Sequence, residues 1–141
     1  MIQRIQTIWL VIAAACAFGT YWFPIYKGNL AAGTEKLLIL PDQFLLFLLI
    51  FGLGVLAAII IFLFKKRNLQ YRLCIIGVLV SVAVVILEYS RTESFKQENN
   101  FQSGSYQIGA FLPILMIILF ILAARAIRKD EKLVKSVDRL R

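Results

Sequence analysis

Four long apolar runs, at residues 8–23, 44–64, 73–87 and 108–124, constrain the fold of this chain more than any other feature. A hydrocarbon layer about 30 Å thick needs roughly 17–25 apolar residues per helix. The second run has 21 residues and no charge. The chain is 141 residues long, 60% hydrophobic and 17% charged, which is too apolar for one soluble core of this size.

The runs predict an all-α, polytopic membrane protein with four transmembrane helices in an antiparallel bundle. We expect a single membrane domain over residues 1–141, which includes a helical cytoplasmic tail at about 128–141. The predicted spans are about 5–24, 43–64, 71–89 and 107–127. The short connection between the second and third runs requires these two helices to be antiparallel.

The basic charge lies on alternate connections. Twelve of the 16 Lys and Arg residues fall at the N-terminus, in the 65–72 connection or in the C-terminal tail. Lys and Arg near span ends mark the cytoplasmic side, so both termini are predicted to be cytoplasmic. The net charge of +8 is then explained by topology and by attraction to anionic lipid, and the distribution does not indicate nucleic acid.

The first run resembles a signal peptide in its length and in the preceding Arg4. Its far end is aromatic, with Tyr21, Trp22 and Phe23, which is typical of a membrane interface. We therefore expect the run to be retained as a span. Asp42 before the second run suits a helix N-cap, and the polar segment 90–107 is typical of an exposed loop.

The segment after Ala124 reads RAIRKDEKLVKSVDRLR and contains no Gly or Pro. The fourth span and the tail are therefore predicted to form one helix. An apolar stripe at helical spacing makes this tail a candidate partner-contact face, which could lie on the membrane, on a partner or on a second copy. The alternative is a solvated helix. The stripe consists of Leu133, Val134, Val137 and Leu140.

Small residues recur four apart in three of the runs, and such pairs let helix backbones approach closely in lipid. They predict a compact bundle, or contact with the helices of another protein. The helix-packing candidates are Ala13 with Ala17, Gly54 with Ala58, and Gly77 with Ser81.

Glu88 is the one carboxylate close to a span interior, and an ionisable group there is a candidate polar site. It lies about 24 Å along a helix from Arg72, near the outer interface. There it could pair with Arg91 at i, i+3 spacing, or serve proton- or cation-coupled transport.

The chain contains no histidine, which excludes bis-histidine haem, ordinary His-containing zinc sites and His-activated nucleophiles. No Gly-rich phosphate loop is present. Cys16 and Cys74 lie inside apolar runs without C-x-x-C spacing, so they are expected to be buried thiols. We predict no catalytic, cofactor or metal site, and no enzymatic activity.

Three stretches carry a resemblance to a known family. They are the opening MIQRIQTIWL, the segment IGAFLP at the start of the fourth run, and the ending RAIRKDEKLVKSVDRLR. With them the whole chain resembles the inner-membrane proteins of Bacteroidota grouped as domain of unknown function 4293. The resemblance implies four spans in the bacterial inner membrane, with an uncleaved first span, but it does not indicate any particular activity. It makes Arg4 and the glutamines of MIQRIQ candidates for a contact at the cytoplasmic face.

Two functions follow as expectations. The first is an accessory or scaffold subunit of a larger membrane assembly, with other membrane protein subunits as partners. The alternative is a small transporter or lipid-binding membrane protein, which could act as a homo-oligomer. A polar interior of the bundle would favour transport, and an interior of Leu, Ile and Phe would favour a structural role.

Overall fold

The computed structural model describes residues 3–30, 34–63, 66–99, 101 and 103–138, with the side chains of 5–30, 34–63, 66–99, 101 and 103–134. The described chain is mostly helical and contains four α-helices, a short 3-10 helix and a small sheet. The helices are α1 (Gln3–Gly19), α2 (Phe44–Phe62), α3 (Arg67–Asn99) and α4 (Ile108–Asp138).

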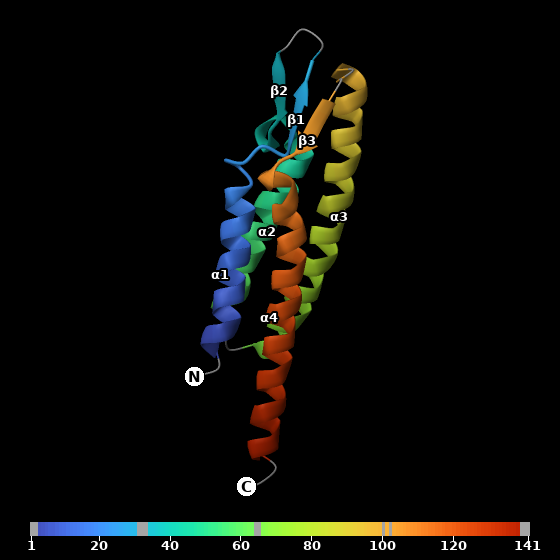
Figure 1. Ribbon diagram of the computed structural model, residues 1–141. Helices are drawn as coiled ribbons and strands as arrows, with labels where there is room; N and C mark the ends of the chain where they lie inside the picture. The colour runs from blue at the N-terminus through green and yellow to red at the C-terminus, as the bar shows by residue number, and fades with distance from the viewer. Residues whose placement is uncertain (1–2, 31–33, 64–65, 100, 102, 139–141) are drawn as a thin grey trace.

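The helices form an elongated bundle in which each packs against the next, and α1 also packs against α4 (Figure 1). Both chain ends lie at one end of the bundle, which we call the terminus end. The sheet lies at the opposite end, which we call the sheet end. At the terminus end, α4 extends beyond the other three helices.

Three helices, α2, α3 and α4, are long and apolar enough to cross a membrane. The helix α1 is apolar but shorter, with 17 residues. It ends in tight turns in which the amides of Tyr21 and Trp22 donate to the carbonyls of Phe18 and Gly19. Pro24 lacks an amide hydrogen and disfavours helical geometry at Phe23, so the chain leaves the helix before it.

A three-stranded antiparallel sheet corrects the all-α prediction. Its strands are β1 (Tyr26–Asn29), β2 (Glu35–Leu38) and β3 (Ser103–Tyr106), in the order β2-β1-β3. Tyr26 pairs with both Leu38 and Tyr106. The sheet therefore joins the connection after α1 to the connection before α4, and polar strands this short gave no periodic signal in the sequence.

Two further expectations were wrong at the sheet end. The expected loop at 90–107 is helical as far as Asn99, because α3 continues well past the apolar run. Asp42 does not cap α2. It lies in the 3-10 helix Leu40–Asp42, and Gln43 takes the cap position without a side-chain hydrogen bond. Pro41 lies at the start of that 3-10 turn, where the fixed φ angle of proline is compatible with a helical backbone.

The middle of the bundle is apolar. The fully buried side chains there come from all four helices and include Leu10, Ile50, Leu53, Val84, Met116 and Phe120. Two buried hydroxyls bond to backbone carbonyls four residues earlier: Thr20, directly after α1, donates to Cys16, and Ser81 of α3 donates to Gly77. These bonds satisfy the hydroxyls, so neither needs a polar partner in the bundle interior.

Candidate functional site

A buried polar cluster lies at the terminus end, where α4 leaves the bundle. Gln6 of α1 donates through Nε2 to Oδ2 of Asp130 on α4. These side chains are only 6% and 5% exposed. Arg67 of α3 donates to the backbone carbonyl of Asp130 at 3.5 Å, and Gln70 donates to the Ile60 carbonyl at 3.0 Å. Hydrogen bonds thus connect α4 to both α1 and α3 at this level.

Two of the stretches that carry the family resemblance meet in this cluster. Gln6 belongs to the opening MIQRIQ, and Asp130 belongs to the ending that begins RAIRKD. A glutamine of the opening was expected to make a contact at this end of the protein, and for Gln6 the structure provides one within the chain itself. Asp130 was missed, because in the sequence it is one charge among many in a basic tail.

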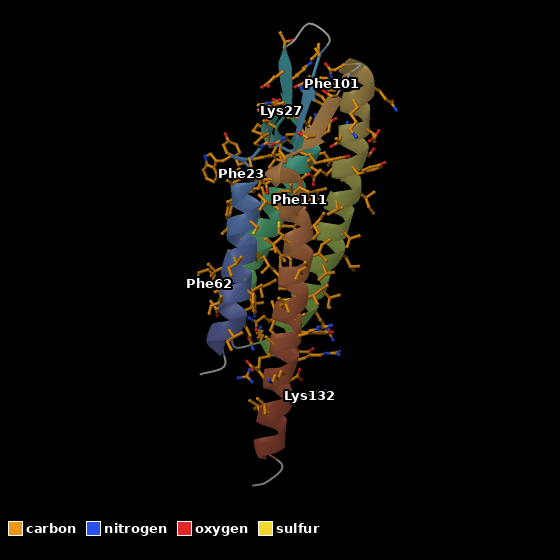
Figure 2. All side chains as sticks on the ribbon, in the orientation of Figure 1. Phe23, Lys27, Phe62, Phe101, Phe111 and Lys132 are labelled. Carbon is orange, nitrogen blue, oxygen red and sulfur yellow. The ribbon has the colours of Figure 1, made fainter. Side chains whose placement is uncertain are left out.

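Beyond this cluster α4 continues without interruption to Asp138, as the absence of Gly and Pro predicts. Leu133 and Val134 are 43% and 45% exposed. Figure 2 shows Lys132 on the same projecting part of the helix. The side chain of Val137 and all of Leu140 lie outside the described residues. The described part of the candidate contact face is therefore a small exposed apolar patch among basic residues.

A second basic feature lies at the terminus end, at the start of α3. Lys66, Arg67 and Arg72 line an open cleft of about 370 Å³ together with Asn68 and Leu69. Arg128 of α4 lies over the ring of Tyr71, 4.4 Å from its centroid. Cations therefore gather on two helices at the same end of the molecule.

The small residues of the predicted packing pairs lie at contacts between helices of this chain. A Cβ at Gly54 would lie 3.2 Å from that of Ala17, so α1 and α2 approach closely there. A Cβ at Gly77 would lie 2.9 Å from the ring of Phe120 on α4. Ala13 and Ser81 are also buried, and Ala58 is half-buried. These positions serve the internal packing of the bundle.

Glu88 departs from its expected role as an interfacial partner of Arg91. Its side chain is 5% exposed, and Oε1 is buried with no hydrogen-bond partner. Neither of the ion pairs Lys27–Glu35 and Lys96–Glu93 involves Glu88, and no pair joins it to Arg91 among the described residues. The expectation failed because α4 covers this face of α3, which sequence spacing along α3 cannot show.

Glu88 lines a cavity of about 230 Å³ between α3 and α4. The other walls are almost entirely apolar or aromatic and include Tyr89, Tyr106, Ala110, Phe111 and Ile114. Phe111, labelled in Figure 2, lies on the part of α4 that is close to the sheet end. The cavity thus combines apolar walls with one acidic side chain.

One cation, Lys96, contacts the wall residue Tyr106 at the edge of this cavity. Nζ of Lys96 lies 2.8 Å from Oε1 of Glu93 and 3.3 Å from the hydroxyl of Tyr106. It also lies over the rings of Tyr26 and Tyr106, at 5.1 and 4.9 Å from their centroids. The hydrogen bond to Glu93 raises the pKa of Lys96 above its ordinary value, because it favours the charged form. Lys96 is therefore a permanent positive charge near Tyr106, a wall of the cavity.

The described residues contain no group of three His, Cys, Asp or Glu side chains that could hold a metal ion. Cys16 and Cys74 are free thiols, and both are buried. The polar features that remain are the cluster around Asp130, the basic cleft and the cavity at Glu88. The cluster around Asp130 is buried and holds α4 to α1 and α3, whereas the basic cleft is open to an anion and the cavity at Glu88 to an amphiphile.

Comparison with known proteins gives one result for the whole chain. A search of curated proteins finds no match. The family described as Domain of unknown function (DUF4293) matches residues 2–140. The match spans nearly the full length and includes both stretches that meet at Gln6 and Asp130, so the chain belongs to the DUF4293 family.

Proposed function

We propose that this protein is a four-span inner-membrane protein of Bacteroidota with both termini in the cytoplasm. Three helices have the length and apolarity of spans, and the 17 residues of α1 reach the lower limit of about 17 for a crossing. An even number of crossings agrees with two termini at one end. The basic cleft at that end supports the orientation and supplies contacts for anionic lipid.

Reporter fusions test this topology. Green fluorescent protein fused after Arg141 should fluoresce, while alkaline phosphatase fused there should be inactive. Leu37, which is 46% exposed at the sheet end, can be replaced by cysteine and treated with a membrane-impermeant maleimide on intact cells. Labelling of Leu37→Cys, with the parent chain unlabelled, is the expected result. An active phosphatase fusion would reverse the orientation.

Within this topology the protein acts as a non-enzymatic accessory or scaffold subunit of a larger membrane assembly. The observation that carries this function is the projecting end of α4. Its base is held to α1 and α3 by the buried contacts of Asp130, so the helix leaves the bundle in a defined direction. Past that base, Leu133 and Val134 are exposed among Arg128, Lys129 and Lys132.

The chemistry of this face specifies the partner. An apolar patch surrounded by cations fits a helix of another subunit that presents apolar anchors flanked by acidic residues. A loosely tethered tail would lose conformational entropy on binding, whereas a helix fixed at its base is already ordered. The proposed role of the Asp130 cluster is to preorganise the contact.

The test is affinity purification of the full chain in mild detergent, with the associated subunits quantified by mass spectrometry. Leu133→Ser with Val134→Ser should remove a stoichiometric partner. Leu37→Ser is the matched control, because Leu37 has similar exposure at the opposite end, and it should retain the partner. Recovery of the wild-type chain without any stoichiometric partner would refute the scaffold function.

Ion-coupled transport is the second candidate, and the buried acid Glu88 is the observation that favours it. Buried apolar side chains fill most of the middle of the bundle. This weighs against a polar path for ions that continues from Glu88. If the scaffold function is right, proteoliposomes with Glu88→Gln and with the wild-type protein should take up a test solute equally when a proton gradient is applied. A loss of coupled uptake in that variant would instead favour transport.

A further inference from the structure

We propose that the cavity at Glu88 is a binding site for a phospholipid with a primary ammonium headgroup, of the phosphatidylethanolamine type. This inference concerns a different surface from the scaffold contact and does not depend on it. It starts from the environment of the Glu88 carboxyl group. A carboxyl group is buried among apolar walls, and one of its oxygens has no donor in the described chain.

The buried carboxyl defines what a ligand must provide. A polar group removed from water is costly unless it is hydrogen-bonded, and a charged one needs a counter-charge. The cations of this region do not supply it. Lys96 is held by Glu93 and Tyr106, and the Arg91 side chain is exposed. The hydroxyl of Thr92, one turn away, donates a hydrogen bond to the backbone carbonyl of Glu88 and not to its carboxyl group. A ligand with an N–H donor and a positive charge would satisfy it.

The walls define the rest of the ligand. The cavity volume is about 230 Å³, and apolar cavities of about 150 Å³ already hold a benzene-sized molecule. Ala110, Phe111 and Ile114 of α4 face Val85 and Tyr89 of α3 across this space. A segment of acyl chain or glycerol ester fits such walls. The ligand is therefore an amphiphile with a small donor headgroup.

Position along the helix favours a lipid as the source. Glu88 lies about 24 Å from Arg72 along α3, which places it near the far interface of a layer about 30 Å thick. Tyr89, which is 62% exposed, lies next to it, as is typical of aromatic residues at the headgroup level. Headgroups lie at this depth, and an ammonium can enter from the side.

The two charges at the cavity match the two charges of that headgroup. The acid Glu88 lies inside, and the cation Lys96 lies at the rim, bound to the wall residue Tyr106. A zwitterionic headgroup can place its ammonium at Glu88 and its phosphate toward Lys96. A choline headgroup has the same charges but no N–H, so it cannot donate a hydrogen bond to the carboxyl group of Glu88. The distinction between ammonium and choline is the chemical content of the proposal.

The test is native mass spectrometry of the full-length protein with equal amounts of phosphatidylethanolamine and phosphatidylcholine of identical acyl chains. We expect about tenfold more bound phosphatidylethanolamine, the factor that one charge-assisted hydrogen bond supplies. Glu88→Gln should reduce this ratio to about one. Glu98→Gln is the matched control, because Glu98 is an exposed acid on the same helix, and it should preserve the ratio.

The N-methylated series of the lipid gives a test that needs no variant. The mono- and dimethyl headgroups retain an N–H and should bind well, with the sharp loss at the trimethyl form. Ala110→Phe, which fills the cavity while leaving Glu88 in place, should reduce binding of every lipid in the series.

Several results would overturn the proposal. One is equal binding of the ethanolamine and choline lipids by the wild-type protein, and another is a preference that persists in Glu88→Gln. Stronger binding of phosphatidylglycerol, whose hydroxyls donate but whose charge is negative, would exclude the ammonium assignment. A dimer that forms in phosphatidylcholine and is lost in Glu88→Gln would assign the cavity to a second copy of the chain.

Discussion

The two ends of the bundle are both held together by polar contacts, but in opposite environments. At the terminus end, Gln6 and Asp130 are almost fully buried and join helices that are far apart in sequence. At the sheet end, the ion pair between Lys27 and Glu35 lies across two paired strands, with side chains 36% and 59% exposed. A buried polar contact costs much when one partner is lost, whereas an exposed ion pair contributes little. The terminus end should therefore be sensitive to single substitutions, and the sheet end tolerant.

The strongest test of this comparison is a pair of glutamine substitutions. Gln6→Ala leaves the buried Asp130 without its side-chain donor, and we expect the free energy of unfolding to fall by about 3 kcal/mol. Gln107→Ala, at the sheet end, removes only an exposed hydrogen bond to Ser105, and we expect a loss below about 0.5 kcal/mol. Unfolding in mixed micelles with increasing dodecyl sulfate measures both. Equal losses would break the comparison.

The middle of the bundle provides the next largest effect. Gly77→Ala places a methyl group 2.9 Å from the ring of Phe120, so α3 and α4 must shift apart. We expect a loss of about 1–3 kcal/mol, typical of overpacking. Gly52→Ala is the control, because nothing lies within 4 Å of its Cβ position. It should be stabilising by up to about 1 kcal/mol through helix propensity. A destabilised control would mean that the α2 surface is covered in the micelle.

The smallest expected effect belongs to the ion pair of the sheet end. Glu35→Gln should change the free energy of unfolding by less than about 0.5 kcal/mol, and added salt should reduce this difference further by screening the pair. A loss above about 1 kcal/mol would show that the sheet end is not tolerant of a single substitution, contrary to the comparison.

The pH dependence of stability tests a cationic contact at the sheet end. Lys96 has a raised pKa, so its charge contributes to stability at all pH values below the ordinary lysine pKa of about 10.4. That contribution is lost only as the pH rises through the higher pKa of the folded state. Melting curves of the wild-type protein and of Lys96→Met should therefore differ by a constant amount between about pH 6 and 9. A difference that shrinks within this range would contradict the assignment.

The sequence predicted the helices wherever hydrophobicity alone decides. The apolar run that became α2 and the unbroken pattern that became α4 both gave clear signals. The continuation of α3 to Asn99 was missed, because its sequence is polar and typical of a loop. In the fold, Phe95 on this part of the helix contacts Phe101, and the sequence does not show that these two residues are close. The strand Ser103–Tyr106 has no apolar alternation, and its pairing with Tyr26–Asn29 is non-local.

The candidate sites show the same division. Glu88 was singled out by its residue type and depth, but its burial depends on α4 and cannot be read along α3. Asp130 is recognisable only when Gln6 is seen against it. Gly109 illustrates the limit well. A Cβ there would lie 2.5 Å from the Pro24 carbonyl oxygen, so this glycine of the IGAFLP segment permits a contact with a residue far away in the chain.

The strand order of the sheet has a consequence for synthesis. The central strand β1 emerges from the ribosome together with β2, but all of α2 and α3 must be made before β3 exists. During that interval one edge of β1 is open, and only the hairpin can form. In the proposed topology, the edge closes when Ser103–Tyr106 reaches the same side of the membrane as Tyr26–Asn29. Completion of this small sheet therefore requires that the hairpin of α2 and α3 has inserted. Protection of the β1 amides from hydrogen exchange during biogenesis would report when this happens.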